Sequence, residues 1–250
     1  MEGKFTVKSV KTSLEKAGKM AKDILFPPSC PMCDSVMSWD KCICDECSGK
    51  IRYIGEPKCK RCGKQLAKEE AEYCNDCLVN KHYYKSGIAA FVYNDVISKS
   101  IYRFKYHNRR GYAEFYGRTI ADKYRQQVNM WGADVIMPVP IHEKKLIKRG
   151  YNQAELLAKE LGNCLQLPVD KDALVRVIDT KPQKEMDKGS RKKNLEKAFK
   201  IRHNVVKYSK VILVDDIYTT GSTIDECAKT LLESGILEVY FISLSIGAGI

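Results

Sequence analysis

The chain has 250 residues, of which 44% are hydrophobic and 30% are charged, and its formal net charge is +12. This is enough apolar material for one full domain and a smaller module. The charge favours anionic partners without saying which anion. No apolar run approaches the roughly 20 residues that span a bilayer, and the start lacks a signal-peptide pattern. We therefore expect a cytoplasmic protein with no integral membrane segment, which could reach the inner face of the membrane through a partner.

The first segment, residues 1–26, is a basic arm compatible with a helix. It carries an imperfect apolar stripe made by Val7, Val10, Leu14, Ala17, Ala21 and Leu25. We expect the arm to dock on the rest of the protein, with binding to a membrane surface or a partner as the alternative.

The next segment, residues 27–80, holds nine of the eleven cysteines. Eight of them form four C-x-x-C pairs: Cys30 with Cys33, Cys44 with Cys47, Cys59 with Cys62, and Cys74 with Cys77. A C-x-x-C turn directs two thiolates at one ion, and two such turns complete the tetrahedral sulfur shell that Zn²⁺ prefers. The segment therefore predicts two zinc ions, whose binding supplies most of the folding free energy of a module with few large apolar side chains.

Other interpretations of these cysteines are weaker. A disulfide framework and redox-active C-x-x-C sites both lack their usual sequence context, and an iron–sulfur cluster is a minor alternative. The similar gaps between the pairs leave open whether neighbouring pairs share an ion or interleave. Cys42 is a spare thiol or an alternative ligand.

After residue 80 the sequence alternates between strand and helix patterns. Apolar runs predict strands at residues 87–94, 133–140, 211–216 and 238–247. Periodic apolar positions predict helices at residues 94–106, 111–128, 152–165 and 222–235. This alternation is typical of an α/β domain with a mostly parallel sheet flanked by helices, which we expect to span residues 81–250.

Basic and aromatic residues alternate within residues 98–118. Cations meet phosphates and aromatic rings stack on unpaired bases, so the pattern predicts binding of single-stranded nucleic acid, with a solvated surface as the alternative. The candidate DNA-binding residues are Arg103, Lys105, Tyr106, Arg109 and Arg110.

Two adjacent acids, Asp215 and Asp216, follow the apolar run of residues 211–214, which we expect them to end. After them come hydroxyl residues and a glycine at the expected start of a helix: Thr219, Thr220, Gly221, Ser222 and Thr223. Backbone N–H groups and hydroxyls at a helix start form a cradle for a monoester phosphate, and paired carboxylates hold a diol. The stretch DDIYTTGST thus predicts a ribose 5-phosphate site. It lacks the Walker A spacing of a nucleoside triphosphate clamp. A purely structural turn is the alternative.

DDIYTTGST resembles the binding signature of the type I phosphoribosyltransferases, whose ligand is phosphoribosyl pyrophosphate (PRPP). The stretches PVPIHEKKLIKRGYNQAELLAKEL and TKPQKEMDKGSRKKNLEKAF, together with the cysteine-rich start, extend this resemblance over nearly the whole chain. The whole resembles the ComF family of competence-associated proteins. This implies a type I phosphoribosyltransferase fold behind a double zinc ribbon, a role with single-stranded DNA in natural transformation, and a competence helicase or another DNA-uptake protein as partner.

The resemblance also implies roles for individual residues. Asp215 and Asp216 would hold the ribose hydroxyls, and Thr219 to Thr223 the 5-phosphate. Arg149 would bind the pyrophosphate together with Mg²⁺, helped by Lys144, Lys145 and Lys148. Other residues that fit the family pattern are Lys105, Asn152, Gln153, Gln183, Arg191 and Asn194, and the segment from Thr180 to Asn194 resembles a loop that closes over the ligand.

Three functions remain open from the sequence. The first is a competence factor that binds PRPP and single-stranded DNA. The second is an active phosphoribosyltransferase of nucleotide salvage or related metabolism, in which Asp215, Asp216 and Arg149 would be the catalytic residues; the sequence shows no acceptor pocket for it. The third is a zinc-dependent adaptor for DNA or protein with a vestigial PRPP site.

Overall fold

The computed structural model describes residues 27–38, 40–179 and 197–247. The predicted arm at residues 1–26 and the predicted closing loop from Thr180 to Asn194 lie outside this part of the chain. The chain divides into two compact units, one ending at Lys50 and the other beginning at Ile51. We call them the first-knuckle unit and the sheet unit.

The first-knuckle unit is a small turn-rich structure. Cys30 N–H donates to Ser35 O at 2.8 Å, and the short helix α2 (Asp45–Ser48) follows Cys44. Cys30 and Cys47 are buried although the described part of this unit has few large apolar residues around them. Cysteines therefore make up much of the buried interior of this unit.

The sheet unit is built on a four-stranded sheet in the order β1-β6-β5-β2, with every neighbouring pair parallel. The strands are β1 (Ser86–Val92), β2 (Val135–Pro138), β5 (Lys210–Tyr218) and β6 (Glu238–Ile246). These are the four strands that the apolar runs predict. Because the sheet is covered on both faces, the residues of β1, β2 and β6 are nearly all buried, and so is the apolar run of β5 at residues 211–214.

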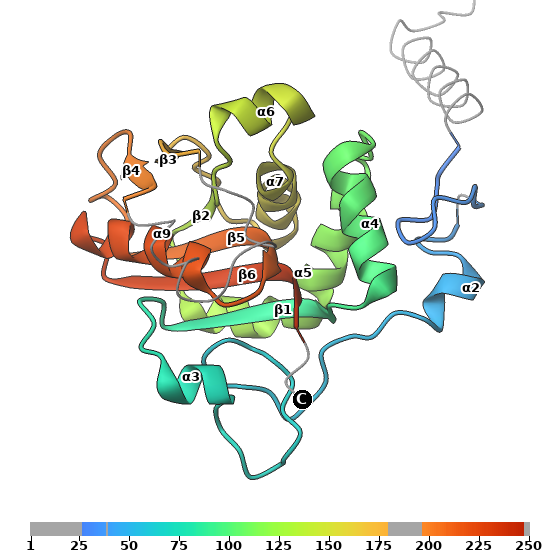
Figure 1. Cartoon of the computed structure of the whole chain (residues 1–250), viewed down its shortest axis with the longest axis horizontal. Helices are drawn as coiled ribbons and strands as arrows, with labels where there is room; N and C mark the ends of the chain where they lie inside the picture. The colour runs from blue at the N-terminus through green and yellow to red at the C-terminus, as the bar shows by residue number, and fades with distance from the viewer. Residues whose placement is uncertain (1–26, 39, 180–196, 248–250) are drawn as a thin grey trace, which may run out of the picture. The chain divides into compact units, whose positions relative to one another are not determined.

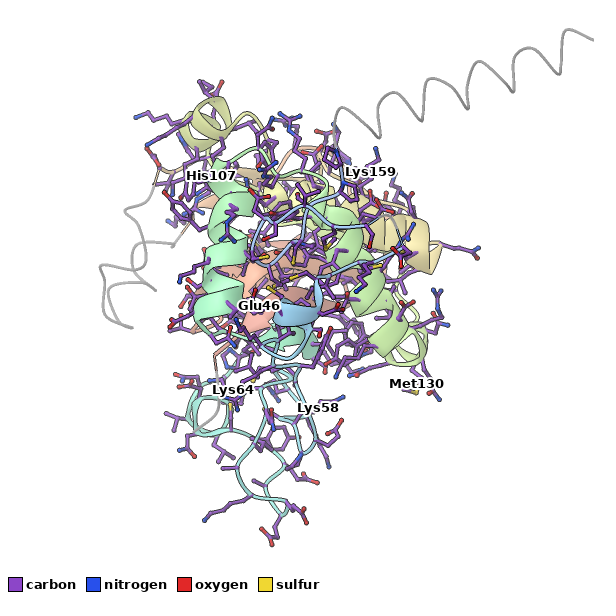
Figure 2. The ribbon with its side chains drawn as sticks, turned by 90° about the vertical axis from the view of Figure 1, so that its right-hand side faces the viewer. Glu46, Lys58, Lys64, His107, Met130 and Lys159 are labelled. Atoms are coloured by element: carbon purple, nitrogen blue, oxygen red, sulfur yellow. The ribbon has the colours of Figure 1, made fainter. Side chains whose placement is uncertain are left out.

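Helices cover both faces of this sheet (Figure 1). Helices α5 and α7 pack on one face and α9 on the other, as right-handed crossovers require when the strand order reverses. The helices of the sheet unit are α3 (Asn75–Val79), α4 (Asp95–Tyr106), α5 (Tyr112–Trp131), α6 (Glu143–Arg149), α7 (Gln153–Leu165) and α9 (Ser222–Glu233). In Figure 2, His107 marks the end of α4 and Met130 the last turn of α5, where its side chain points outward and is 73% exposed.

Three elements after residue 80 have no counterpart among the predictions. Helix α6 lies between β2 and α7, and β3 (Leu174–Arg176) pairs antiparallel with β4 (Phe199–Ile201) in a separate two-stranded sheet. Strands of three residues are too short to show a period of two, which is why the sequence pattern misses them.

The end of β5 corrects one prediction. The two acids do not end the strand: pairing with β6 continues through Asp215 with Ser243, Ile217 with Ser245 and Tyr218 with Ile246. The long partner strand β6 offers ladder hydrogen bonds beyond the acids, and Ile217 and Tyr218 are good strand formers. The phosphate-cradle residues therefore begin after Tyr218.

Both edges of the sheet are covered by short segments. Along β1, Ile54 N–H donates to Ala90 O at 3.0 Å and Gly87 N–H to Arg61 O at 2.8 Å. Along β2, Ile136 N–H donates to Pro168 O at 2.9 Å. Covered edges satisfy backbone groups that would otherwise pair with another chain.

Within the part of the chain that the structure describes, no helix has both the length and the apolar character needed to cross a membrane.

Candidate ligand site and metal centres

The eight C-x-x-C cysteines form two separate groups of four. In each group the Sγ atoms all lie within 4.8 Å of one another: Cys30, Cys33, Cys44 and Cys47, and Cys59, Cys62, Cys74 and Cys77. Neighbouring pairs thus share a centre, which decides the pairing that spacing left open. Four sulfur atoms at this separation fit the tetrahedral shell of Zn²⁺, so the chain has two centres suited to zinc. Cys42 is exposed and belongs to neither group.

The two groups differ in their surroundings. Cys33 is half-buried, and although burial raises its pKa, contacts that include the Ser35 hydroxyl at 3.2 Å lower the pKa of Cys33 to about 6. In the second group Cys59, Cys62 and Cys74 are buried and belong to the same hydrophobic cluster as Leu213 of β5 and Phe241 of β6. The second group is therefore part of the core of the sheet unit.

Gly63 explains how the turns that carry Cys59, Cys62, Cys74 and Cys77, which we call the second knuckle, approach β1 so closely. Its φ is +73°, and a Cβ at this position would lie 2.7 Å from Gly87 O. Only glycine fits both the left-handed backbone and the contact with the strand. The backbone of the knuckle, rather than an apolar stripe, makes this contact, so no periodic pattern could have revealed it.

The two acids lie near the carboxyl end of β5, where open α/β sheets bind their ligands. Both are partly buried. Asp216 N–H donates to Asp215 Oδ1 at 2.8 Å. Asp216 Oδ2 lies 2.7 Å from Lys105 Nζ on α4. The structure thus places Lys105 against the acid pair, where the sequence left it facing either PRPP or DNA.

Asp215 has an unusual protonation behaviour. Burial and the nearby charge of Asp216 raise the pKa of Asp215 to about 7, against the opposing effects of the Asp216 N–H group and of Lys105 and Arg176. A carboxyl group whose pKa lies near neutral, beside a second carboxylate and a lysine, is typical of functional sites.

This pKa predicts a pH dependence of stability. Between about pH 4, where the free side chain titrates, and pH 7, the folded state keeps a proton on Asp215 that the unfolded state has lost. The contribution of this group to the free energy of unfolding therefore falls as the pH rises through that window. Urea unfolding at pH 5, 6, 7 and 8 should show the wild type losing stability relative to the Asp215→Asn variant. Asp122→Asn, at an exposed position, is the control: its free energy of unfolding should differ from that of the wild type by the same amount at each pH. A constant offset for Asp215→Asn would contradict the prediction.

The last turn of α4 connects the acids to the RGYNQ stretch. Arg149 Nη2 donates to Tyr106 Oη at 2.9 Å and its guanidinium lies 4.8 Å from the centre of that ring. Its Nη1 donates to Gln153 Oε1 at 3.0 Å. Gln153 is 1% exposed, and its amide faces Lys105 O at 3.5 Å. One helical turn, Lys105 and Tyr106, thus fixes both an acid and the cation predicted to bind pyrophosphate.

Asn152 has a local role. It caps α7 by accepting from Ala154 N–H at 3.1 Å, and its amide donates to Val139 O at 3.0 Å. It fixes the chain after β2 rather than presenting a free polar group.

Several basic side chains influence one another in this part of the sheet unit. Burial and the positive charges of Arg176, Arg149 and Lys105 lower the pKa of Lys145. Of these cations, Lys105 contacts the acid pair directly, through Asp216. Burial also lowers the pKa of Arg176, and Asp215 is among the groups that act on it. Of the other predicted helpers, Lys144 is exposed and 3.9 Å from Asp179, and Lys148 is exposed. Sequence reasoning missed Arg176 because it lies on the short strand β3, far from every motif.

The predicted phosphate cradle forms the link from β5 to α9. Gly221 has φ +78° and precedes the first residue of α9. Thr220 Oγ1 lies 2.8 Å from Ser222 Oγ, Thr219 is exposed, and Thr223 lies in the first turn of the helix. The N–H groups and hydroxyls of this loop are gathered at a helix N-terminus, as anion binding requires.

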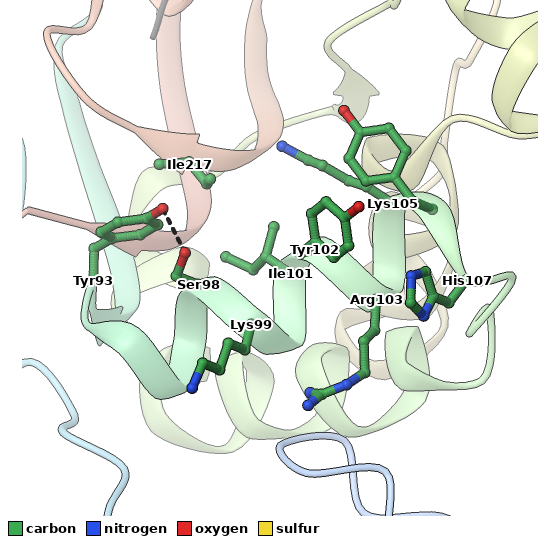
Figure 3. Close-up of a pocket in the computed structure, with 10 residues that line it drawn as sticks. Tyr93, Ser98, Lys99, Ile101, Tyr102, Arg103, Lys105, His107 and Ile217 are labelled. Atoms are coloured by element: carbon green, nitrogen blue, oxygen red, sulfur yellow. Dashed lines mark hydrogen bonds between the residues drawn. The ribbon is translucent and has the colours of Figure 1, made fainter.

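A cavity of about 320 Å³ lies beside Lys105 (Figure 3). It is lined by Tyr93, Ser98, Lys99, Ile101, Tyr102, Arg103, Lys105, Tyr106, His107 and Ile217. Rings and aliphatic side chains form its walls, and its lining has three basic residues and no acid. Figure 3 shows the Lys105 side chain extending from α4 toward Ile217.

The predicted DNA-binding residues divide between this cavity and the next turn. Arg103, Lys105 and Tyr106 line the cavity. Arg110 lies 4.6 Å from the centre of the Tyr151 ring, and Arg109 is exposed in the turn before α5. Gln183, Arg191 and Asn194 lie outside the described residues.

Comparison with known proteins identifies the family. Competence protein F of Haemophilus influenzae is 32% identical over 204 residues, which cover 79% of this chain and 87% of that protein. The chain belongs to the ComF family. Competence protein ComFC of Bacillus subtilis is 27% identical over 232 residues, covering 82% of this chain and 89% of that protein. DNA utilization protein YhgH of Escherichia coli K12 is 28% identical over 200 residues, covering 79% and 87%.

Two further comparisons concern the architecture of this ComF-family chain. A model for the double zinc ribbon domain matches residues 21–78. A purine phosphoribosyltransferase from Pyrococcus horikoshii is 17% identical, covering 54% of this chain and 72% of that chain with a TM-score of 0.33. The predicted class, a mostly parallel sheet flanked by helices behind a double zinc ribbon, is confirmed by the sheet topology and the ribbon match.

Proposed function

We propose that the chain binds phosphoribosyl pyrophosphate at the end of β5 and handles single-stranded DNA at the adjacent cavity, in the cytoplasm, as part of DNA uptake. The observation that carries the proposal is the acid pair near the end of β5, which Lys105 contacts through Asp216 and which the loop at residues 219–223 follows in the chain. The names of the competence relatives support the cellular context.

Each part of the ligand has a chemical counterpart in the site. The loop at 219–223 takes the 5-phosphate through N–H groups and hydroxyls at a helix start. Asp215 and Asp216 accept hydrogen bonds from the ribose diol. Lys105, Lys145, Arg149 and Arg176 are the proposed cations for the pyrophosphate, and Mg²⁺ enters with its oxygens, as it does with other diphosphates.

Calorimetric titration of PRPP with Mg²⁺ into the zinc-loaded chain tests the proposal. The Asp215→Asn, Asp216→Asn double variant should bind at least about 100-fold more weakly, since two charge-assisted hydrogen bonds are lost. The exposed Asp122→Asn should bind like the wild type. If the wild type fails to bind, the PRPP-binding proposal fails, and the alternative of a zinc-dependent adaptor with a vestigial site is left.

The cavity beside Lys105 is the proposed place for an unpaired base of the DNA strand. Its aromatic walls suit a base plane and its three cations suit the phosphates on either side. Tyr102, which is 55% exposed and 5.0 Å from the Tyr106 ring, is the ring that a base can reach without disturbing Arg149.

The Tyr102→Ala variant should bind a single-stranded oligonucleotide roughly tenfold more weakly, because one base loses its stacking partner. Arg103→Gln should reduce the slope of log affinity against log salt by roughly 0.7, the value for one phosphate contact. Fluorescence anisotropy at several salt concentrations measures both. Tyr83→Ala removes another half-exposed ring and serves as the control; an equal loss there would contradict a specific base site.

Transfer of the phosphoribosyl group is a second candidate function, favoured by the cavity next to the acid pair. The C1–oxygen bond to pyrophosphate would break, an acceptor nitrogen would bond to C1 and lose its proton, and the cations would stabilise the departing pyrophosphate. Release of pyrophosphate that depends on an added base, nucleotide or DNA end distinguishes an enzyme from a PRPP-binding factor. A competence helicase or another DNA-uptake protein is the proposed protein partner.

A further inference from the structure

The segment that leaves the second zinc knuckle, residues 82–84, contacts the start of α9. His82 Nδ1 lies 2.6 Å from Asp225 Oδ2, and Tyr83 N–H donates to Asp225 Oδ1 at 3.0 Å. A carboxylate only accepts, so His82 Nδ1 carries the proton in this contact. The His82 side chain is 2% exposed. Asp225 lies in the first turn of α9, directly after the predicted phosphate cradle.

The same segment also reaches the other end of the cradle. Tyr84 Oη lies 2.5 Å from Tyr218 Oη at the end of β5, and both rings are buried. Each packs on Phe241, with ring centres 4.8 Å apart in both cases. His82 stacks on Tyr84 at 4.8 Å. His82 contacts Asp225 and Tyr84 contacts Tyr218, and these two rings stack on each other.

Tyr218 in turn supports the glycine of the cradle. A Cβ at Gly221 would lie 2.4 Å from Tyr218 Oη, so the loop rests on that hydroxyl. The residues before and after the loop, Tyr218 and Asp225, are thus both fixed by the segment that follows Cys77. The knuckle itself is held in the core of the sheet unit by Cys59 and Cys62.

We propose that His82 and Tyr84 are positioning residues that hold the loop at 219–223 in the conformation that binds the phosphate monoester of a sugar phosphate. They do not touch the ligand; they act through Asp225 and Tyr218. A loop that is already ordered loses less conformational entropy on binding, and this raises affinity. The second knuckle is therefore a support of the ligand site as well as part of the core. The inference rests on the proposed function only for the identity of the ligand.

Two variants of the full zinc-loaded chain test these roles. Tyr84→Phe removes only the hydroxyl that meets Tyr218, and His82→Ala removes the donor to Asp225. Each should weaken the binding of ribose 5-phosphate, measured by calorimetry, by roughly three- to tenfold, the effect of one net hydrogen bond. His82→Asn, whose amide can still donate to Asp225, should recover part of the affinity. This variant also serves if His82→Ala does not fold.

Tyr124→Phe is the matched control. Tyr124 is buried in the same unit and donates to Ala89 O at 2.8 Å, and its hydroxyl has no bond to the loop or to α9. It should bind ribose 5-phosphate within about twofold of wild type. Equal losses of affinity in Tyr84→Phe and Tyr124→Phe, or no loss in either, would overturn the proposal.

Amide hydrogen exchange separates this inference from the proposed function. In the ligand-free chain, Tyr84→Phe should accelerate exchange at residues 219–225 and leave Leu213 in the centre of β5 protected. If wild type does not bind ribose 5-phosphate, the proposed ligand is wrong, and faster exchange confined to the loop still supports the positioning role. Unchanged exchange at 219–225, or an equal change in Tyr124→Phe, would overturn it.

Discussion

Replacing Cys62 with serine should destabilise the sheet unit severely, whereas replacing Cys33 should not. Cys62 is 1% exposed and belongs to the hydrophobic cluster that includes residues of β5 and β6. Losing the metal there also leaves three buried thiols without their ion. We expect the free energy of unfolding of the sheet unit to fall by about 4 kcal/mol or more, the range reached by loss of a structural metal.

The measurement combines zinc content with chemical unfolding. Cys62→Ser and Cys33→Ser should each retain one zinc ion where the wild type holds two. Only Cys62→Ser should shift the unfolding of the sheet unit, followed by the fluorescence of Trp131 on α5 in chains that carry Trp39→Phe. The exposed Cys42→Ser should keep both ions and wild-type stability. If the two ligand variants destabilise the sheet unit equally, the second knuckle is not the one built into its core.

The difference between the two cysteine centres, one of which is part of the sheet core, could be predicted only in part from the sequence. The C-x-x-C spacing predicts both centres, and the similar gaps left the pairing open. That one centre joins the core of the sheet could not be predicted, because the contact is made by the backbone at Gly63 and Arg61 and by the cysteines themselves. Neither kind of contact produces a hydrophobic period.

The strands and long helices were predictable for the opposite reason. Buried parallel strands are continuous apolar runs, and amphipathic helices repeat every 3.6 residues, so local sequence carries the signal. The end of β5 was predicted wrongly because the length of its partner β6 decides it. The mutual influence of Lys105, Lys145, Arg149 and Arg176 depends on three different elements, α4, α6 and β3, and no single stretch of sequence contains it.

The Gly221→Ala variant should lose roughly 100-fold in affinity for PRPP, corresponding to about 2.7 kcal/mol. Alanine at φ +78° is strained, and its Cβ would lie 2.4 Å from Tyr218 Oη. That hydroxyl cannot move aside easily, since Tyr218 is buried and bonded to Tyr84. The loop must therefore shift, and the N–H groups proposed to bind the phosphate shift with it. Calorimetric titration with PRPP and Mg²⁺ measures the loss.

Gly132→Ala is the control that separates strain from collision. Gly132 ends α5 with φ +59°, and a Cβ there would meet no atom within 4 Å. Both variants share the cost of a left-handed alanine, about 1 kcal/mol of stability, but only Gly221→Ala displaces the loop. Gly132→Ala should lower the melting temperature slightly and bind PRPP like the wild type. An equal loss of affinity in both variants would assign the effect to global destabilisation. Wild-type affinity in Gly221→Ala would show that the loop at residues 219–223 is not part of the PRPP-binding site.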